Sequence, residues 1–79
     1  YDFYTADYYD CTDCGGGVVG QILVAFPTGQ VVTLNRFYQP IGGPDGLAYR
    51  VIDVASPGIA YILTTAYGST TTCTLACSV

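Results

Sequence analysis

The chain alternates between short runs of apolar and β-branched residues and clusters of turn-forming residues. The runs cover residues 18–26, 31–38, 47–54, 59–67 and, in a Thr-rich form, 70–78. Their Val, Ile, Thr, Tyr and Phe side chains prefer the pleated, half-buried surface of a β-sheet. No window keeps apolar residues at positions i, i+3, i+4 and i+7 for three turns without Gly, Pro or clustered β-branched residues. The pattern therefore predicts strands and little helix.

The residues between the runs predict where the chain turns. Pro27-Thr28-Gly29-Gln30 favours a bulged hairpin between the first two runs, because proline fixes φ for a turn and glycine accepts a positive φ. Residues 39–46 contain two prolines and three glycines and are expected to form a loop, while Ser56-Pro57-Gly58 and Gly68-Ser69 are expected to turn the chain again. Apolar side chains occupy both alternate sets of positions in residues 31–38, so both faces of that strand are expected to be partly covered.

This succession of runs and turns is typical of an all-β domain, a small antiparallel sandwich or barrel of five to six strands. At 79 residues the chain is one domain, and a domain of that size removes only about 60% of its unfolded surface from water. A covalent cross-link is therefore expected to stabilise it. We divide the sequence into a Tyr-rich N-terminal arm with a Cys-x-x-Cys motif and a glycine linker, residues 1–17, and a β-domain, residues 18–79.

The N-terminal segment is unusually aromatic, with five rings interleaved with aspartates in its first ten residues. Such rings combine a large apolar area with a polar group at one end. Two interpretations follow: an edge strand or arm that lays its rings on the core of its own domain, or an arm that docks on a neighbouring subunit. The candidate subunit-contact residues are Tyr1, Phe3, Tyr4, Tyr8 and Tyr9.

The low charge of the chain excludes several classes of partner. Only 10% of the residues are charged, the formal net charge is -4, and Arg36 and Arg50 are the only cations, so nucleic-acid binding is not expected. Each arginine is expected to pair with Asp53 or another Asp, or to lie over a Tyr ring. No apolar run reaches the roughly 18 residues that span a bilayer. The sequence begins at Tyr1 without a basic leader segment, which we interpret as a mature exported chain or a piece of a longer one.

Four cysteines lie in two pairs near the ends of the chain: Cys11, Cys14, Cys73 and Cys77. An even number in a small, lysine-free chain predicts disulfides. A spacing of three or four residues disfavours a bond within a pair, so we expect Cys11 to bond Cys77 and Cys14 to bond Cys73, or the crossed arrangement. Two alternatives remain at this point: one zinc ion held by all four thiolates, and disulfides to other copies of the chain.

Catalytic chemistry finds little support in the sequence. There is no histidine or lysine, and the serines lie in expected turns or near the end, so nucleophilic catalysis is not expected. A redox Cys-x-x-Cys would need a following helix, whereas three glycines follow here. Asp7, Asp10 and Asp13 are spaced by three and could bind calcium with Asp2, but the glycine and closing Glu of an EF-hand are missing. We expect no enzyme activity, no cofactor and no metal.

The stretch from Tyr4 to Cys14, with Cys73 and Cys77 near the other end, resembles small cysteine-paired β modules of long surface or fibre proteins of Bacteroidota and their phages. The resemblance implies a structural or adhesive building block of an extracellular filament, surface adhesin or phage fibre. Its partners would be copies of itself or a parent fibre protein, and its place would be extracellular, on the cell surface or in the virion. The alternative is a monomeric secreted binding domain for a glycan or protein, with residues 40–46 as its contact surface.

Overall fold

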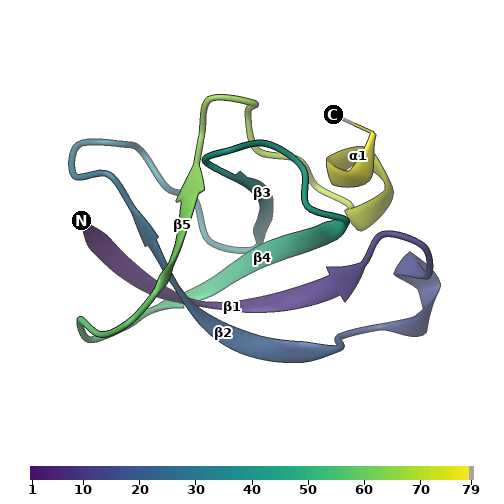
Figure 1. Ribbon diagram of the computed structural model, residues 1–79, viewed down its shortest axis with the longest axis horizontal. Coiled ribbons are helices and arrows are strands. Elements are labelled where there is room, and N and C mark those ends of the chain that lie inside the picture. Colours follow the sequence, from purple (N-terminus) through teal and green to yellow (C-terminus); the bar gives the residue numbers. More distant parts are fainter. Residues whose placement is uncertain (79) are drawn as a thin grey trace.

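The computed structural model describes residues 1–78, whose five strands close into a barrel (Figure 1). The strands are β1 (Asp2–Asp10), β2 (Gly20–Phe26), β3 (Arg36–Pro40), β4 (Leu47–Val54) and β5 (Tyr61–Thr64), joined by a 3-10 turn, η1 (Cys14–Gly16), and a short helix, α1 (Cys73–Cys77). Around the barrel the order is β1-β2-β5-β3-β4. The predicted all-β fold with five to six strands is confirmed, with one parallel contact, between β2 and β5. Neither helix is long enough to cross a membrane.

The first ten residues form part of the barrel wall. β1 pairs with β2 along Asp2–Tyr8 and with β4 along Tyr4–Asp10, antiparallel on both sides. A register shift between Thr5 and Ala6 in the β4 pairing bends the strand, as bulges do where a sheet curves into a barrel. The division into an arm at residues 1–17 and a β-domain at residues 18–79 therefore does not describe this fold. The aromatic-rich segment is the strand with the most extensive pairing.

The expected hairpin between the first two runs is wrong, although its turn is present. Gln30 donates its backbone N–H to the Pro27 carbonyl at 3.2 Å, and Gly29 has φ of 97°. The chain then continues as irregular backbone to Asn35, and β2 pairs with β1 and β5 instead of β3. Gln30 also accepts the backbone N–H of Thr65 at 3.1 Å, which connects the turn to the segment after β5. A local turn signal does not decide which strands become neighbours.

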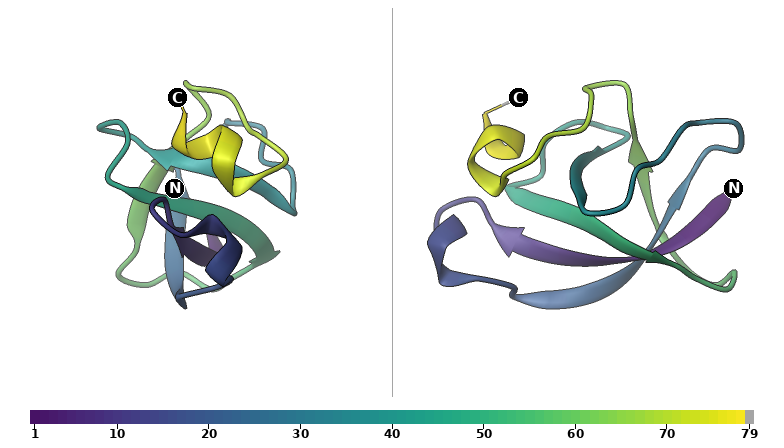
Figure 2. Two further views of the ribbon diagram at one scale, coloured as in Figure 1. Left: turned by 90° about the vertical axis from the view of Figure 1, so that its right-hand side faces the viewer. Right: turned by 180° about the vertical axis from the view of Figure 1, so that it is seen from behind.

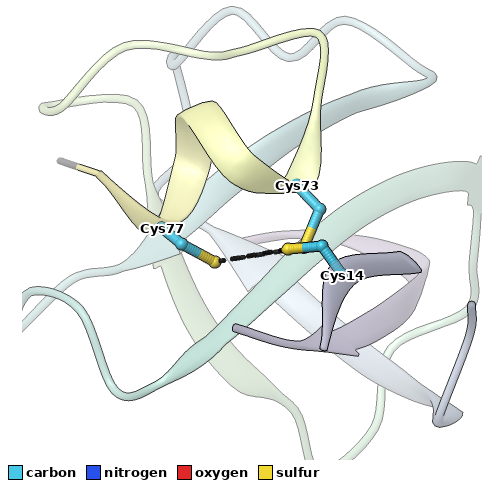
Figure 3. Close-up of side chains that lie close together, drawn as sticks. All are labelled: Cys14, Cys73 and Cys77. Atoms are coloured by element: carbon cyan, nitrogen blue, oxygen red, sulfur yellow. Dashed lines mark hydrogen bonds between the residues drawn. A yellow bond between two sulfur atoms is a disulfide. The ribbon is translucent and has the colours of Figure 1, made fainter. Parts of the chain in front are cut away.

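The last run forms a helix instead of the expected strand, with only an isolated bridge between Thr70 and Phe37 before it. The Thr72 side chain accepts the Leu75 backbone N–H at 3.1 Å, which is the N-cap arrangement that starts a helix. Within α1, Cys73 and Cys77 are four residues apart and therefore lie on the same face. Figure 3 shows both sulfurs turned toward the Cys14 side of the barrel.

Tyr1 and helix α1 lie at opposite ends of the molecule, as the views in Figures 1 and 2 show. The molecule measures 30 × 23 × 19 Å along its principal axes. β1 starts at Asp2, next to the amino terminus, and leads toward Cys11, which is bonded to Cys77 of α1. The cysteines therefore join the end of β1 to the end of the chain, and they leave the amino terminus at the far side.

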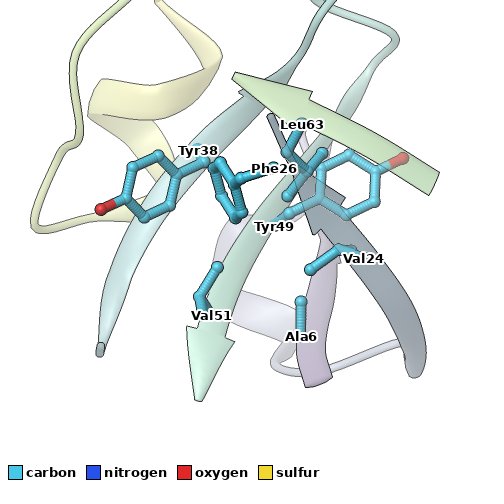
Figure 4. Close-up of a cluster of buried hydrophobic side chains, with 7 residues drawn as sticks. All are labelled: Ala6, Val24, Phe26, Tyr38, Tyr49, Val51 and Leu63. Carbon is cyan, nitrogen blue, oxygen red and sulfur yellow. The ribbon is translucent and has the colours of Figure 1, made fainter. Parts of the chain in front are cut away.

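The barrel interior is filled mainly by aromatic and branched side chains (Figure 4). Phe26 packs edge-on against Tyr38 with ring centroids 4.9 Å apart, and Tyr4 packs on Phe26 at 5.7 Å. The buried set is Ala6, Val24, Phe26, Tyr38, Tyr49, Val51 and Leu63. Alternate residues of β4 face this core, as strand geometry requires. Burying such a side chain stabilises a fold by about 1.5–3 kcal/mol.

A second, smaller cluster lies outside the barrel, beneath α1. Its buried members are Phe37, Ala48, Cys73 and Ala76. Phe37 and Tyr38 are adjacent in β3 and point to opposite faces, so Tyr38 fills the barrel while Phe37 contacts the helix side. The prediction that both faces of this strand are covered is confirmed for β3.

Candidate functional site

Two disulfides connect the end of β1 to α1. Cys11 bonds Cys77 and Cys14 bonds Cys73, with Cα atoms 5.6 and 5.7 Å apart. This is the first of the two predicted arrangements, and the crossed one is wrong. All four cysteines of the chain are bonded within it, so the structure shows neither four free thiolates nor cysteines left for a second chain. We call these four residues the sulfur cluster.

The two disulfides touch each other. Cys77 Sγ lies 3.9 Å from Cys14 Sγ and 3.9 Å from Cys73 Sγ (Figure 3). Neither sulfur of a disulfide carries a hydrogen, so these are van der Waals contacts. Cys73 is buried and the other three are half-buried against the second cluster. The sulfur cluster is thus compact, partly accessible to solvent, and bordered by the ring of Tyr9.

Hydrogen bonds position both halves of the sulfur cluster independently of the disulfides. The Cys11 backbone N–H donates to the Gly46 carbonyl at 3.0 Å, and Asp13 N–H closes a turn onto the Asp10 carbonyl at 2.9 Å. On the other side, the buried Gln39 side chain donates its amide N–H to the carbonyl of Ala76, in the last turn of α1. The strand end and the helix are therefore held in place by the barrel itself.

The aromatic residues predicted to contact a neighbouring subunit divide into two groups. Tyr4 and Tyr8 pack on the barrel core, and Tyr9 packs on Phe37 with centroids 5.3 Å apart. Phe3 is half-buried, and Tyr1 is 64% exposed. Three of the five rings are thus engaged within their own domain, and Tyr1 is the one whose surface is mostly free.

The two arginines have different partners. Arg50 forms a salt bridge with Asp7 at 3.2 Å and lies over the Tyr9 ring, 5.8 Å from its centroid, as expected. Asp7 is buried and also accepts the Gln21 amide at 2.9 Å. The expectation is wrong for Arg36, which donates to the Ser69 hydroxyl at 2.6 Å and the Ser69 carbonyl at 3.0 Å. Arg36 therefore fixes the turn at residues 68–69.

The aspartates considered for calcium binding are engaged separately. Asp7 is occupied by Arg50 and Gln21, whereas Asp10 accepts the backbone N–H of Thr12 at 2.9 Å and its hydroxyl at 2.7 Å. These hydrogen bonds, the backbone one first, lower the pKa of the exposed Asp10 carboxyl. Among residues 1–78, the side chains grouped closely enough to hold a metal ion are those of Cys14, Cys73 and Cys77.

A polar cluster that the sequence did not predict lies at the loop after β3. Tyr49 and Tyr61 both donate their hydroxyls to Asp45 Oδ2, at 2.5 and 2.9 Å, and the Leu47 backbone N–H donates to Asp45 Oδ1 at 3.0 Å. Burial, and then the adjacent Asp45 carboxylate, raise the pKa of both tyrosines. Asp45 therefore ties the loop after β3 to strands β4 and β5.

The described residues enclose no detected pocket. Comparison of the chain with protein-family models, with curated proteins and with solved structures finds no match in any of the three. The chemically distinctive feature of the described residues is the sulfur cluster that joins β1 to α1.

Proposed function

We propose that the chain is an exported, disulfide-linked β module that serves as a structural or adhesive building block of an extracellular filament, surface adhesin or phage fibre. The observation that carries this proposal is the Cys11–Cys77 disulfide together with the position of Tyr1 at the opposite end of the molecule. Structural disulfides persist in oxidising surroundings outside the cytosol. The arrangement suits a module that transmits tension from one neighbour to the next.

The covalent path between the chain ends is short. Tension applied at Tyr1 runs along β1 to Cys11, crosses the disulfide to Cys77 and leaves at the carboxyl end. Residues 12–76 lie in a closed loop outside this path. β1 in turn is hydrogen-bonded on both sides, to β2 and β4. A module under tension would therefore extend only a little, which is a property that a fibre subunit needs.

The surface also supports contacts between copies. Few of its residues are charged, and large apolar side chains are exposed on several segments. Such side chains leave water when copies of the chain associate, which favours association. Tyr1, Val18, Val19, Val31, Ile41, Val54, Ile59, Tyr67 and Leu75 are among these exposed residues. Of the five aromatic residues proposed for subunit contact, Tyr1 is 64% exposed, which supports assigning the contact to it.

Electron microscopy and light scattering of the purified, oxidised chain test this proposal. We expect filaments or ordered oligomers, and we expect Tyr1→Ala to reduce assembly at least tenfold while leaving the thermal melt unchanged. Tyr67→Ala removes a comparably exposed ring from the segment after β5 and serves as the matched control. A purified chain that stays monomeric at the highest soluble concentration would overturn the proposal.

The second candidate is a monomeric secreted domain that binds a glycan or protein through residues 40–46. The observation in its favour is that this loop is ordered before any ligand binds, since Asp45 is held by Tyr49 and Tyr61, while Ile41 is 54% exposed. A preorganised loop loses little entropy on binding. Binding to an immobilised glycan or protein panel that disappears in Ile41→Ala, with the chain monomeric throughout, would favour this function over assembly.

A further inference from the structure

Three of the four sulfurs in the sulfur cluster, those of Cys14, Cys73 and Cys77, lie close enough together to share one metal ion, and Cys11 is bonded to the last of them. Cys14, Cys73 and Cys77 place their sulfurs within 4.8 Å of one another, and two of the contacts between different disulfides are 3.9 Å. Four sulfurs at ~2.3 Å from a tetrahedral zinc ion lie ~3.8 Å from each other. The contacts between the two disulfides already match the edge of that tetrahedron.

We propose that, when both disulfides are reduced, Cys11, Cys14, Cys73 and Cys77 bind one zinc ion or a similar thiophilic divalent cation in place of the two covalent bonds. The ligands come as Cys-x-x-Cys at the end of β1 and Cys-x-x-x-Cys along α1, and both spacings lie within the range seen in structural zinc sites. The formal net charge of -4 favours a cation over an anion. This inference does not rest on the proposed function.

The polypeptide around the sulfur cluster is suited to keep four thiols together. Cys11 N–H is bonded to the Gly46 carbonyl, and the turn of Asp13 onto Asp10 shapes the first pair. Gln39 and the bridge between Phe37 and Thr70 hold the helix that carries the second pair. None of these contacts is made by a sulfur atom, so we expect them to keep the ligands near one another after reduction, with side-chain rotation opening each bonded pair.

The chemistry balances with a phosphine as the reductant. For each disulfide, one phosphine and one water yield two thiols and one phosphine oxide, so the sulfurs gain two electrons and two protons while phosphorus is oxidised. Zinc then displaces the four thiol protons to the buffer and forms four zinc–thiolate bonds. The barrel would thus have two alternative cross-links, disulfides in oxidising surroundings and a metal ion in reducing ones.

Cobalt(II) is the probe that tests this, because tetrahedral cobalt thiolates absorb strongly in the visible and near ultraviolet. We expect the phosphine-reduced chain, kept under anaerobic conditions, to develop these bands, to saturate at one cobalt per chain and to lose them when one equivalent of zinc is added. Zinc should also raise the melting temperature of the reduced chain. The oxidised chain should bind neither ion.

Two variants make the result specific. The double variant Cys11→Ser with Cys77→Ser keeps the Cys14–Cys73 disulfide, so its fold can be verified before reduction, and it should bind cobalt at least 100-fold more weakly. Thr74→Ala changes an exposed position of α1 between the ligands and should bind as wild type does. Absent cobalt bands, equal binding by the double variant, or cobalt binding without a zinc-dependent rise in melting temperature would each overturn the proposal. Such a failure would leave assembly of the oxidised chain unaffected.

Discussion

Individual polar residues in this chain act mainly by fixing loops. Asp45 collects two phenol hydroxyls and one backbone N–H, and Arg36 holds Ser69. The raised pKa of Tyr49 means that the folded chain retains the phenol proton more tightly than the unfolded chain, whose tyrosines titrate near pH 10. The stability that Tyr49 gains from this is complete below about pH 10 and is lost as the pH rises toward its folded pKa.

Tyr49→Phe should therefore flatten the alkaline stability profile. We expect the wild-type melting temperature to fall between pH 9 and pH 11, and the variant to fall less steeply while being less stable at pH 7 by about 1 kcal/mol, the usual contribution of one hydrogen bond. Tyr67→Phe, at an exposed ring, is the control and should follow the wild type. Parallel profiles for wild type and Tyr49→Phe would show that the Asp45 contact does not govern alkaline stability.

The sequence predicted the residues of the sulfur cluster but not those of the Asp45 cluster. Cysteines are few and their oxidised partners are limited by spacing, so four of them near the chain ends point to one another. Asp45 and Tyr49 are four residues apart, but Tyr61 is 16 residues from Asp45 and lies on β5, a strand that is not hydrogen-bonded to β4. Only the closure of the barrel brings Tyr61 next to Tyr49, with ring centroids 5.3 Å apart.

At the scale of elements, the pattern of apolar and polar residues predicted where strands lie more reliably than which strands pair with each other. β2 and β4 lie within the predicted runs, since their side chains face two different environments. The partner of β2 was missed because a turn at Pro27–Gln30 is compatible with either a hairpin or a crossover to another part of the sheet. The first ten residues were predicted as an arm because rings and aspartates alternate there. In the structure Tyr4 and Tyr8 pack on the barrel core, and Asp7 forms a salt bridge with Arg50.

Helix α1 was missed because it is short and preceded by four β-branched or turn-favouring residues. Its first turn depends on the Thr72 cap, so Thr72→Ala should destabilise the chain by about 1 kcal/mol, which lowers the melting temperature by roughly 4–8 °C in a domain of this size. Thermal unfolding followed by circular dichroism measures this. Thr74 is exposed and lies two residues after Thr72, so Thr74→Ala should have little effect. An equal loss in both variants would contradict the capping role of Thr72.

At the scale of the whole molecule, the Cys11–Cys77 disulfide sets how far the chain can be extended. With handles attached at the two chain ends, the oxidised chain can be stretched only along residues 1–11 and 77–79, about 14 residues with a total contour length of ~50 Å. After reduction, the stretched chain of 79 residues has a total contour length of roughly 280 Å. Single-molecule force spectroscopy distinguishes these lengths. A long extension of the oxidised chain would show that the disulfide does not close the loop.

The bonds Cys11–Cys77 and Cys14–Cys73 join the end of β1 to helix α1. Closing a loop of this length stabilises a fold by about 4 kcal/mol in the chain-entropy model, with less from the second bridge. Mass spectrometry after alkylation in denaturant without reductant tests this claim most directly. We predict an unalkylated chain four hydrogens lighter than the reduced form, with peptides linked in these two pairs. Four alkylated cysteines in the native material, or the crossed pairing, would contradict it.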